Sequence, residues 1–332
     1  MAGNGALGLP LGSAQGVSAN CEASVVMSVY NGASNLAVTM DSILSQAGVE
    51  LELIVVNDGS TDKTGEILND YVRRDDRVRI IHQANTGLTR ALIRGCAVAT
   101  GEFIARQDAG DVSLAGRLAL QLDVFKNNPT VVMTSCGSRF IGPDGEVLNE
   151  VCQTGEELNR GLQHIEIECV RSVSHHTSVM FRRKSYEMVG GYRPQFRVAQ
   201  DLDLWMRLSE VGVCWATPDV LCEVHLSRNS ISATRRAEQI RTARAIVKCA
   251  AARRSGRDDS KLVARWASQC RSRHFSCWPP GRLQDARFYY FIGSLLRHRQ
   301  PEQAQRYFWR AVSAWFLYPK AWYRIFWASG QR

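Results

Sequence analysis

The chain has 332 residues, of which 45% are hydrophobic and 22% are charged. This length allows one large domain or two ordinary ones, and the composition excludes wholesale disorder and a small disulfide scaffold. Ten cysteines are spread along the chain without a Cys-x-x-Cys pair, and no His and Cys spacing matches a tetrahedral zinc site. We therefore expect reduced thiols in a cytoplasmic protein.

The net charge of +9 is unevenly distributed along the chain. Residues 1–230 hold 20 Lys and Arg against 27 Asp and Glu, a net charge of −7, whereas residues 231–332 hold 21 against 5, a net charge of +16. An anionic partner is therefore expected to meet the C-terminal third. No run of 18 apolar residues predicts a spanning helix. Residues 1–20 lack the basic start of a secretory signal and are expected to form a loose extension.

Short β-branched runs alternate with helical stretches through the first hundred residues. Strands are predicted at 23–29, 51–56, 78–82 and 102–105, and the first three are each followed by a segment of helical period. This alternation predicts a parallel sheet with right-handed crossovers. Such sheets bind ligands beyond the carboxyl ends of their strands, so polar residues just after the strands are candidate site residues.

The middle of the chain is predicted to add more strands and one helix. Strands are expected on both sides of a turn at 142–145, at 177–181, and as a short pair within 213–225. A helix is predicted at 201–211, and its inward-facing residues are Leu204, Trp205 and Leu208.

After Ser232 the strand signals stop and the pattern becomes helical. One helix is predicted to start at Pro301, because proline suits the first turn of a helix. The residues that recur on one face of this helix are Ala304, Phe308, Ala311 and Trp315.

The turn after the second predicted strand holds two aspartates. Asp58 has the position of a carboxylate that accepts hydrogen bonds from a nucleoside base or ribose at the sheet edge. Asn-Asp-Gly-Ser is also a common Asx turn, so the alternative is that Asp58 only stabilises its own turn. Asp62 is expected to cap a helix that starts near Lys63.

Asp108 and Asp111 follow the fourth predicted strand in one tight turn, where Ala109 and Gly110 let the backbone bend. Mg²⁺ or Mn²⁺ takes oxygen ligands and keeps several waters, so one or two carboxylates and the phosphates of a nucleotide diphosphate make a complete site. The alternative is that Asp111 caps a helix beginning near Ser113 and that Asp108 is a solvated turn residue.

Asp201 and Asp203 open the predicted helix at 201–211. The helix dipole is expected to hold the pKa of each carboxyl down, and Gln200 supplies no like charge that would raise the pKa of Asp201. A carboxylate at this place can serve as a base that deprotonates a sugar hydroxyl as the new bond forms. The alternative is that both aspartates only cap the helix.

Six segments together resemble the family 2 glycosyltransferases, which have the GT-A fold. In chain order these segments are SVVMSVYNG (24–32), LIVVNDGSTD (53–62), NTGLTRA (85–91), GEFIARQDAGD (101–111), HTSVMFRR (176–183) and GGYRPQFRVAQDLDLWMRL (190–208). Each segment alone is a weak signal, whereas six in order at suitable spacing are specific to the family. The resemblance covers about residues 22–232.

The resemblance implies an α/β GT-A fold, with a mixed, mostly parallel sheet flanked by helices, followed here by an all-helical extension. It implies an inverting, metal-dependent transferase that uses Mg²⁺ or Mn²⁺. The donor would be a UDP-, GDP- or dTDP-sugar, and the acceptor a hydroxyl of a saccharide or of a lipid-linked molecule. Cell-envelope or exopolysaccharide biosynthesis is the process that the resemblance indicates.

The resemblance also assigns residues to this chemistry. Asp201 falls on the catalytic base, while Asp108 and Asp111 fall in the metal and diphosphate motif. Nucleotide-sugar contacts fall on Tyr30, Asn31, Asp58, Asn85, Gly87, Arg90 and Asp108. Weaker positions for the acceptor or the diphosphate are His176, Trp205 and His225. Gly110 stands where the family usually has a second acidic residue, which leaves the degree of metal dependence open.

The resemblance gives a catalytic domain at 21–231 and leaves a basic helical region at 232–332 outside it. This region could form a helical hairpin that resembles a tetratricopeptide-like pair, or it could lie on anionic lipid at the inner face of the cytoplasmic membrane. A third alternative is that its tryptophans only fill a helical core and its arginines form a solvated face. Nucleic acid is not expected as a partner, because the basic residues carry no recognition motif. The alternative to an enzyme is a catalytically impaired GT-A protein that binds partners through its helical tail.

Overall fold

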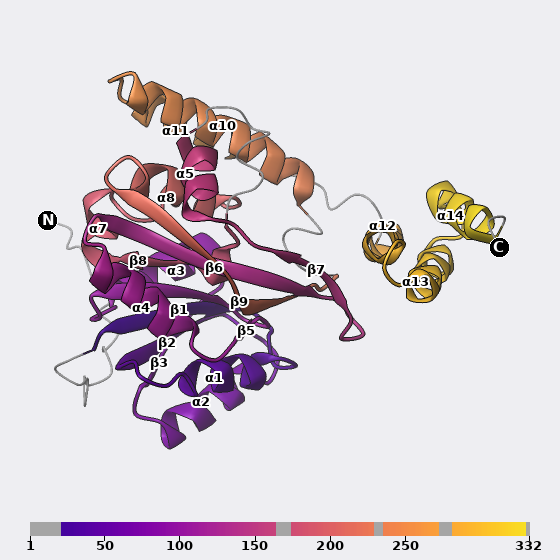
Figure 1. Cartoon of the computed structure of the whole chain (residues 1–332), viewed down its shortest axis with the longest axis horizontal. Helices are drawn as coiled ribbons and strands as arrows, with labels where there is room; N and C mark the ends of the chain where they lie inside the picture. Colours follow the sequence, from indigo (N-terminus) through magenta and orange to yellow (C-terminus); the bar gives the residue numbers. More distant parts are fainter. Residues whose placement is uncertain (1–20, 164–173, 229–234, 272–280, 330–332) are drawn as a thin grey trace, which may run out of the picture.

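The computed structural model describes residues 21–163, 174–228, 235–271 and 281–329. The extension predicted at 1–20 lies outside the described residues. Within them, nine strands form one sheet in the order β3-β2-β1-β4-β8-β6-β9-β5, and β7 pairs with β6. The fold is the predicted α/β sheet with flanking helices, followed by helices alone (Figure 1).

The first half of the sheet is parallel, as the alternating pattern predicted. Its strands are β1 (Ala23–Val29), β2 (Leu51–Asp58), β3 (Val78–Gln83) and β4 (Phe103–Asp108). The connecting helices are α1 (Leu36–Leu44), α2 (Thr64–Arg74) and α3 (Leu88–Ala97). β2 and β4 extend two or three residues beyond their predicted ends, so that Asp58 and Asp108 are the last residues of their strands.

The second half of the sheet is mixed, because β8 is antiparallel to both of its neighbours and β6 and β9 are parallel to each other. These strands are β5 (Val112–Ser113), β6 (Val131–Ile141), β7 (Val147–Val151), β8 (Met180–Arg182) and β9 (Val213–His225). β4, β6 and β9 therefore run in the same direction and end at the same edge of the sheet.

Two strand predictions in this half were wrong in detail. The predicted pair within 213–225 is the single strand β9, because Pro218 and Asp219 bulge out between two residues that both continue the pairing with β6. The predicted strand at 177–181 is divided into a 3₁₀ turn, His176–Ser178, and the short strand β8.

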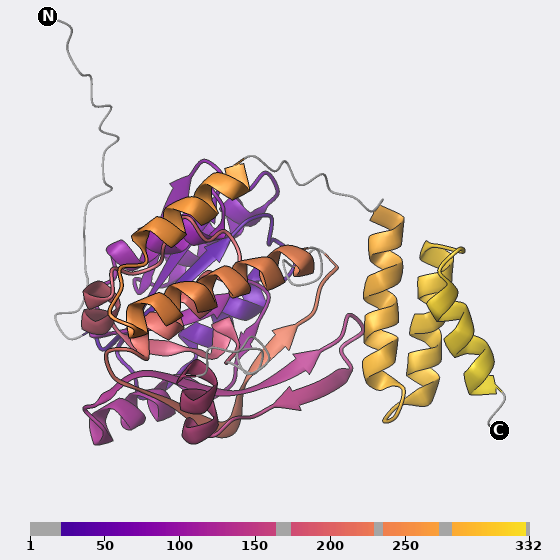
Figure 2. The same ribbon diagram turned by 90° about the horizontal axis from the view of Figure 1, so that it is seen from above.

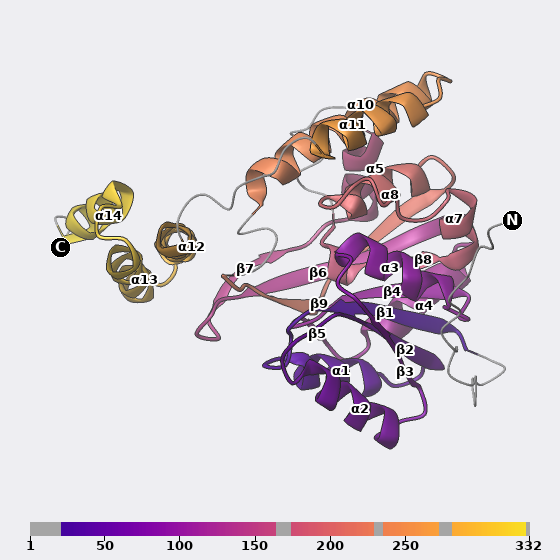
Figure 3. The same ribbon diagram turned by 180° about the vertical axis from the view of Figure 1, so that it is seen from behind.

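Apolar residues cover both faces of the sheet, since successive side chains of a strand point to opposite sides. In β1, Val25 and Met27 pack with α1, α2 and α4 (Arg117–Asn127), while Val26 packs with the opposite layer. That opposite layer consists of α3, α5 (Gly155–Gln163), α8 (Gln200–Leu208), α10 (Arg236–Arg254) and α11 (Ser260–Arg271), with α7 (Arg183–Met188) beside it. Figure 3 shows these two layers on either side of the sheet.

The helical region has two parts. α10 and α11 pack against α8 and share the core of the sheet's upper layer through residues such as Ile246 and Val263. α12 (Gly281–Leu296), α13 (Pro301–Ala314) and α14 (Pro319–Ser329) form a three-helix unit with a core of its own. Figure 2 shows this unit beyond the tip of the β6–β7 hairpin. Pro301 begins α13 as predicted, and Ala304, Phe308 and Ala311 are buried, whereas Trp315 lies after the helix.

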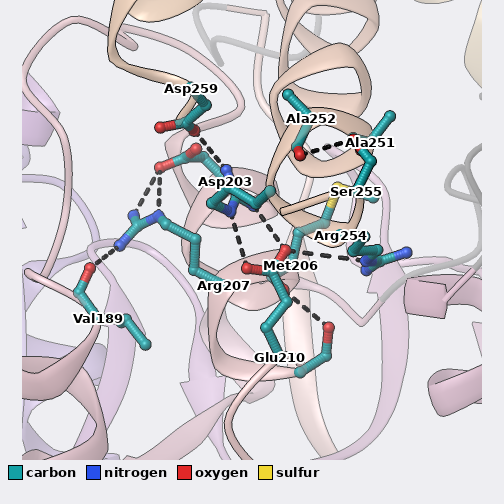
Figure 4. Close-up of polar contacts among 12 residues, drawn as sticks. Val189, Asp203, Met206, Arg207, Glu210, Ala251, Ala252, Arg254, Ser255 and Asp259 are labelled. Carbon is teal, nitrogen blue, oxygen red and sulfur yellow. Dashed lines mark hydrogen bonds and ion pairs between the residues drawn. The ribbon is translucent and has the colours of Figure 1, made fainter. Parts of the chain in front are cut away.

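A network of arginines and carboxylates attaches α10 and α11 to α8 (Figure 4). Asp203 is fully buried, and its carboxylate accepts hydrogen bonds from Arg193 and, at 2.6 Å, from Arg207. Asp259 accepts from Arg193 at 2.8 Å and from Arg253 at 2.5 Å. Burial alone would raise the pKa of Asp259, but these two guanidinium groups outweigh it and lower the pKa. Asp203 therefore has a structural role at this junction and is more than a helix cap.

None of the helices within the described ranges combines the length and the apolar character needed to span a bilayer.

Candidate active site

The loops after β1 and β2 are hydrogen-bonded to each other at the carboxyl edge of the sheet. The Asn31 side-chain oxygen accepts from the Thr61 backbone N–H at 2.8 Å, and the Asn31 backbone N–H donates to Ser60 Oγ at 3.0 Å. Asn31 has a φ of 51°, a left-handed conformation that asparagine tolerates better than most residues. This pairing presents the half-exposed ring of Tyr30 to solvent beside the loop after β2.

Asp58 holds the loop that follows β3. Its carboxylate is buried and accepts from the backbone N–H groups of Thr86 and Gly87, both at 2.8 Å, and from Gln83 Nε2 at 2.6 Å. Gly59 lies so close to this loop that a Cβ there would stand 2.6 Å from the Asn85 backbone nitrogen. Asp58 thus joins the loop after β2 to the loop after β3, so its role is not limited to an Asx turn in its own loop. A direct contact of Asp58 with a nucleoside stays a prediction.

The loop that Asp58 holds carries three other predicted donor contacts. Gly87 has a φ of 88°, which few side chains other than that of glycine allow. Asn85 and Arg90 are exposed on either side of it, at the end of the loop and in the first turn of α3. Asp62 accepts from the Thr64 backbone N–H at 3.0 Å and so stabilises the start of α2, although the N-cap residue of this helix is Lys63.

Asp108 ends β4 and forms an ion pair with Arg106, whose side chain is 2% exposed. The Arg106 Nε–H donates to His176 Nε2 at 3.2 Å, and the Tyr192 hydroxyl lies 2.8 Å from the same nitrogen. Burial alone would raise the pKa of Asp108, but the neighbouring groups, of which Arg106 contributes most, together outweigh it and lower the pKa. Burial, and then Arg106, hold the pKa of His176 well below its usual value. Asp108 is therefore ionised, and its partner Arg106 is hydrogen-bonded to the neutral side chain of His176.

Asp111 does not cap a helix, because α4 begins only at Arg117. Its Oδ1 accepts instead from the backbone N–H of His225, at the end of β9, at 3.0 Å. Burial, and then the charge of Asp108, raise the pKa of Asp111 well above its usual value. Gly110 between the two aspartates has a φ of 104°, so the position that is usually acidic in the family has a backbone conformation that suits glycine here.

Asp201 lies in the first turn of α8, and its side chain is half-buried. Burial raises the pKa of Asp201 to about 6, and the charge of Asp108 adds to the rise. The expectation that the helix dipole would hold this pKa down was wrong, because desolvation and a carboxylate distant in the sequence outweigh it. The preceding Ala199 has a φ of 53°, a strained conformation for alanine at the entry to this helix.

His176 and Trp205 lie beneath this site, since they are 6% and 2% exposed and their rings contact each other with centroids 6.0 Å apart. Leu204, Trp205 and Leu208 face the core as predicted. His225 is close to Asp111 through its backbone, and its Nε2 is buried without a hydrogen-bond partner among the described residues. A role of the three predicted residues in binding acceptor or diphosphate stays a prediction.

A divalent cation fits Asp108 and Asp111 by the chemistry of their donor set. Burial and the charge of Asp108 both disfavour the ionised form of Asp111. A hard cation bound to the two carboxylates would stabilise that form, and its remaining ligands would be waters and phosphates. Within the described ranges, no cluster of three or more His, Cys, Asp and Glu side chains is arranged to hold a metal alone. Such a cation would therefore depend on the ligand's own phosphates.

Arg106 and Arg117 are site residues that the sequence interpretation missed. Arg117 is fully buried and donates to Gln107 Oε1 at 2.7 Å and to the Arg106 carbonyl oxygen at 2.8 Å, which fixes the end of β4. The available signal was Arg106 itself, because a charged residue inside a strand that is otherwise buried requires a partner. Its spacing of two from Asp108 puts both side chains on one face of β4.

A protein-family model matches the part of the chain that contains this edge of the sheet. Residues 24–190 match the model of glycosyl transferase family 2. The chain belongs to this family. The matched range contains the loops after β1, β2, β3 and β4, and it ends ten residues before the helix that carries Asp201.

The curated relatives of the chain include a putative glycosyltransferase and a chondroitin synthase. The chain is 32% identical over 193 residues to EpsE of Bacillus subtilis (strain 168), an alignment that covers 57% of this chain and 67% of EpsE. It is 29% identical over 189 residues to the chondroitin synthase of Pasteurella multocida (strain Pm70), covering 57% of this chain. The matched part spans only 19% of that synthase's length.

Solved structures confirm the GT-A fold. The mannosyltransferase PcManGT of Pyrobaculum calidifontis, solved with GDP-Man and Mn²⁺, aligns with a TM-score of 0.55 and 17% identity over 94% of this chain and 87% of that one. Staphylococcus aureus TarS (residues 1–349), solved with UDP-GlcNAc, aligns with a TM-score of 0.54 and 15% identity over 92% and 89% of the two chains.

Proposed function

We propose that this family 2 protein is an inverting glycosyltransferase, which moves a sugar from a nucleotide diphosphate sugar to a hydroxyl of a saccharide or lipid-linked acceptor. The observation that carries the proposal is that Asp201 is half-buried at the start of α8, near enough to Asp108 for its charge to help raise the pKa of Asp201 to about 6. A base with a pKa near neutrality is suited to take a proton from a hydroxyl at physiological pH.

In the proposed reaction, the Asp201 carboxylate accepts the proton of the acceptor hydroxyl while that oxygen forms a bond to the anomeric carbon. The bond between the anomeric carbon and the diphosphate oxygen breaks on the opposite face, so the configuration is inverted and a nucleotide diphosphate is released. Positive charge develops on the ring oxygen as in other glycosyl transfers. The exposed Tyr30, Asn85 and Arg90 would bind and orient the donor, since Asn31 and Asp58 hold the strand-end loops beside them together.

Asp108 and Asp111 would hold Mg²⁺ or Mn²⁺, with Asp111 positioned by the His225 backbone N–H. When bound, such a cation neutralises charge on the diphosphate. Arg106 keeps Asp108 ionised and oriented, and His176, itself bonded to the Tyr192 hydroxyl, accepts from Arg106. The metal dependence is supported by the Mn²⁺ in the PcManGT structure and by the donor set of this chain.

We further propose residues 21–231 as the catalytic domain, with α10 and α11 as a covering layer attached through Asp203 and Asp259. Polysaccharide synthesis in the bacterial envelope is the proposed process, supported by the names of the relatives. The proposed location is the cytoplasm, with peripheral contact at the inner face of the cytoplasmic membrane.

A panel of UDP-, GDP- and dTDP-sugars tests this function. The purified chain with Mn²⁺ should release the nucleotide diphosphate from at least one donor, and NMR of the product should show inversion at the anomeric carbon. Retention of configuration would contradict the inverting mechanism. If no donor binds by calorimetry and none is hydrolysed, the alternative of a catalytically impaired binding protein is favoured.

A further inference from the structure

The three-helix unit (α12–α14, residues 281–329) carries most of the exposed aromatic surface of the described chain. Seven aromatic side chains are exposed among the described residues, and five of them belong to this unit: Phe291, Trp309, Phe316, Tyr323 and Phe326. Leu317, next to Phe316 in the loop between α13 and α14, is 74% exposed. Isolated exposed apolar residues are normal, whereas a contiguous group of this kind marks an interaction site.

Three of these rings, together with the half-buried Trp322, form a pre-built aromatic cluster, defined here as Trp309, Phe316, Trp322 and Phe326. Trp322 is at its centre: it meets the edges of Trp309 and Phe316 with centroids 5.7 and 5.3 Å apart, and it stacks on Phe326 at 5.7 Å. The Trp322 indole N–H donates to the Phe316 carbonyl oxygen at 2.7 Å. The cluster is thus held in one arrangement, and its binding would cost little conformational entropy.

Exposed cations lie on the two helices that carry the aromatic cluster. α14 buries Ala321 and Ile325 against the unit's core, which directs Lys320 and Tyr323 to the outside. Arg306 is exposed one turn before Trp309 on the same side of α13. Residues 281–329 hold 8 Lys and Arg against 2 Asp and Glu, a net charge of +6.

We propose that the α13–α14 face of this unit binds the surface of an anionic membrane. The face consists of the aromatic cluster, Leu317 and the exposed cations Arg306 and Lys320. Tryptophan and tyrosine prefer the headgroup region of a bilayer, and Lys and Arg bind anionic headgroups there. A second copy of the chain is disfavoured as the occupant because two such faces would repel each other. Nucleic acid is disfavoured because Leu317, the most exposed large hydrophobic residue described, offers no ring on which a base could stack.

The position of the unit connects this face to the candidate active site. Asp111 accepts from the His225 backbone N–H, and the next residue, Leu226, packs against the core of the three-helix unit. The tip of the β6–β7 hairpin also contacts the unit, through Leu148 and an ion pair of Asp144 with Arg310 at 2.7 Å. The unit therefore lies beyond the ends of β6 and β9, which run in the same direction as β4 (Figure 1). If the proposed transfer is correct, a membrane bound there would hold a lipid-linked acceptor near the ends of these strands.

Co-sedimentation of the full chain with vesicles tests the proposal. The chain should bind vesicles of mixed phosphatidylcholine and phosphatidylglycerol. Binding should weaken when salt is added, and also when the vesicles contain phosphatidylcholine alone. Phe316→Ser combined with Leu317→Ser, and separately Arg306→Glu combined with Lys320→Glu, should each reduce binding at least about tenfold, because each removes one of the two contributions. All four residues are exposed, so the variants should keep the circular dichroism spectrum and melting temperature of the parent chain.

Matched controls lie far from this unit in the chain. Met188→Ser, at an apolar residue of α7 that is 64% exposed, and Arg73→Glu combined with Arg74→Glu on α2 should leave vesicle binding unchanged. Absence of binding to the anionic vesicles by the parent chain would overturn the proposal, as would equal losses in the control variants. A change of oligomeric state in the Phe316 and Leu317 variant, without a change in vesicle binding, would assign the face to a second copy. The assay contains no donor sugar, so its failure with nucleotide release intact would leave the proposed function standing.

Discussion

The carboxyl edge of the sheet and the three-helix unit differ in the kind of residue that lies in an unfavourable environment. The sheet edge buries charged residues, whereas the three-helix unit exposes aromatic ones. At the sheet edge, charged groups such as Arg106, Asp111 and Arg117 are buried, and each is hydrogen-bonded within the protein. On the three-helix unit, Phe316 and Phe326 are each 68% exposed. Buried charges and exposed rings both cost free energy in an isolated chain, so each is evidence of a ligand or partner that the respective region binds.

The two regions also differ in how they are attached. α10 and α11 share a core with the sheet and are joined to it by Asp203 and Asp259, whereas α12–α14 have a core of their own. We therefore expect changes at the sheet edge to affect both folding and chemistry, and changes in the three-helix unit to leave the chemistry intact. Four substitutions or conditions can break or sharpen this contrast.

Arg106→Met should have the largest effect on stability. It leaves Asp108 without its cation and removes the donor to His176, and breaking one side of a buried ion pair typically costs about 3–5 kcal/mol. Urea denaturation measures the loss in the free energy of unfolding. Arg139→Met, which removes a surface pair with Glu150, is the control and should cost about 1 kcal/mol or less. Equal losses in the two variants would contradict the structural role of Arg106.

Phe308→Ala should destabilise the three-helix unit by about 3 kcal/mol or more, because Phe308 is 4% exposed in the core of that unit. The unit should then unfold at lower temperature than the sheet, giving two transitions in calorimetry. Donor binding by the same variant should equal that of the parent chain. A loss of donor binding would show that the two regions are coupled more tightly than their separate cores indicate.

The pH dependence of turnover should report Asp201. Because its pKa is raised to about 6, the ionised base is lost as the pH falls through 6, and turnover should drop about tenfold per pH unit below that value. The raised pKa also means that the ionised carboxyl destabilises the folded state above pH 6. Asp201→Asn should therefore melt at a higher temperature than the parent chain at pH 8, and the difference should shrink toward pH 4. An unchanged difference across this range would contradict the raised pKa.

Gly87→Ala should have the smallest effect, about 1 kcal/mol of stability, because alanine is strained at a φ of 88°. It should also weaken donor binding, since the loop with Asn85 would shift. Gly48→Ala is a matched control: Gly48 has a φ of 72°, a Cβ added there would meet no atom within 4 Å, and the residue lies after α1. Calorimetry with the donor should show weaker binding for the first variant alone.

Sequence patterns predicted the regular parts of the fold well. β1 matches its predicted range, and the other parallel strands differ by no more than three residues at either end, because their apolar runs are bounded by clear turn residues. The error at β9 arose because Pro218 and Asp219 resemble a turn, and only the pairing with β6 makes them a bulge. Such pairing joins residues about 80 positions apart, which no local pattern contains.

The sequence indicated which residues to consider for the candidate site, but not the pKa shifts that their surroundings cause. Strand-end positions indicated Asp58, Asp108 and Asp111, since the ends of parallel strands meet at one edge. The pKa of Asp201 was misjudged because the local helix dipole is visible in the sequence, whereas burial and the charge of Asp108 are not. The support of Asp108 by Arg106, His176 and Tyr192 likewise depends on tertiary contacts.

Turnover by Asp201→Asn tests the central claim most directly, because this change keeps the size of the side chain and removes only its ability to accept a proton. With a donor identified from the nucleotide-sugar panel, the account predicts a fall in turnover of about 10²–10⁴-fold and an unchanged dissociation constant for the donor. Asp258→Asn, the same change near the start of α11, should leave both quantities as they are. Full turnover by Asp201→Asn, or a loss confined to donor binding, would contradict the assignment of Asp201 as the base.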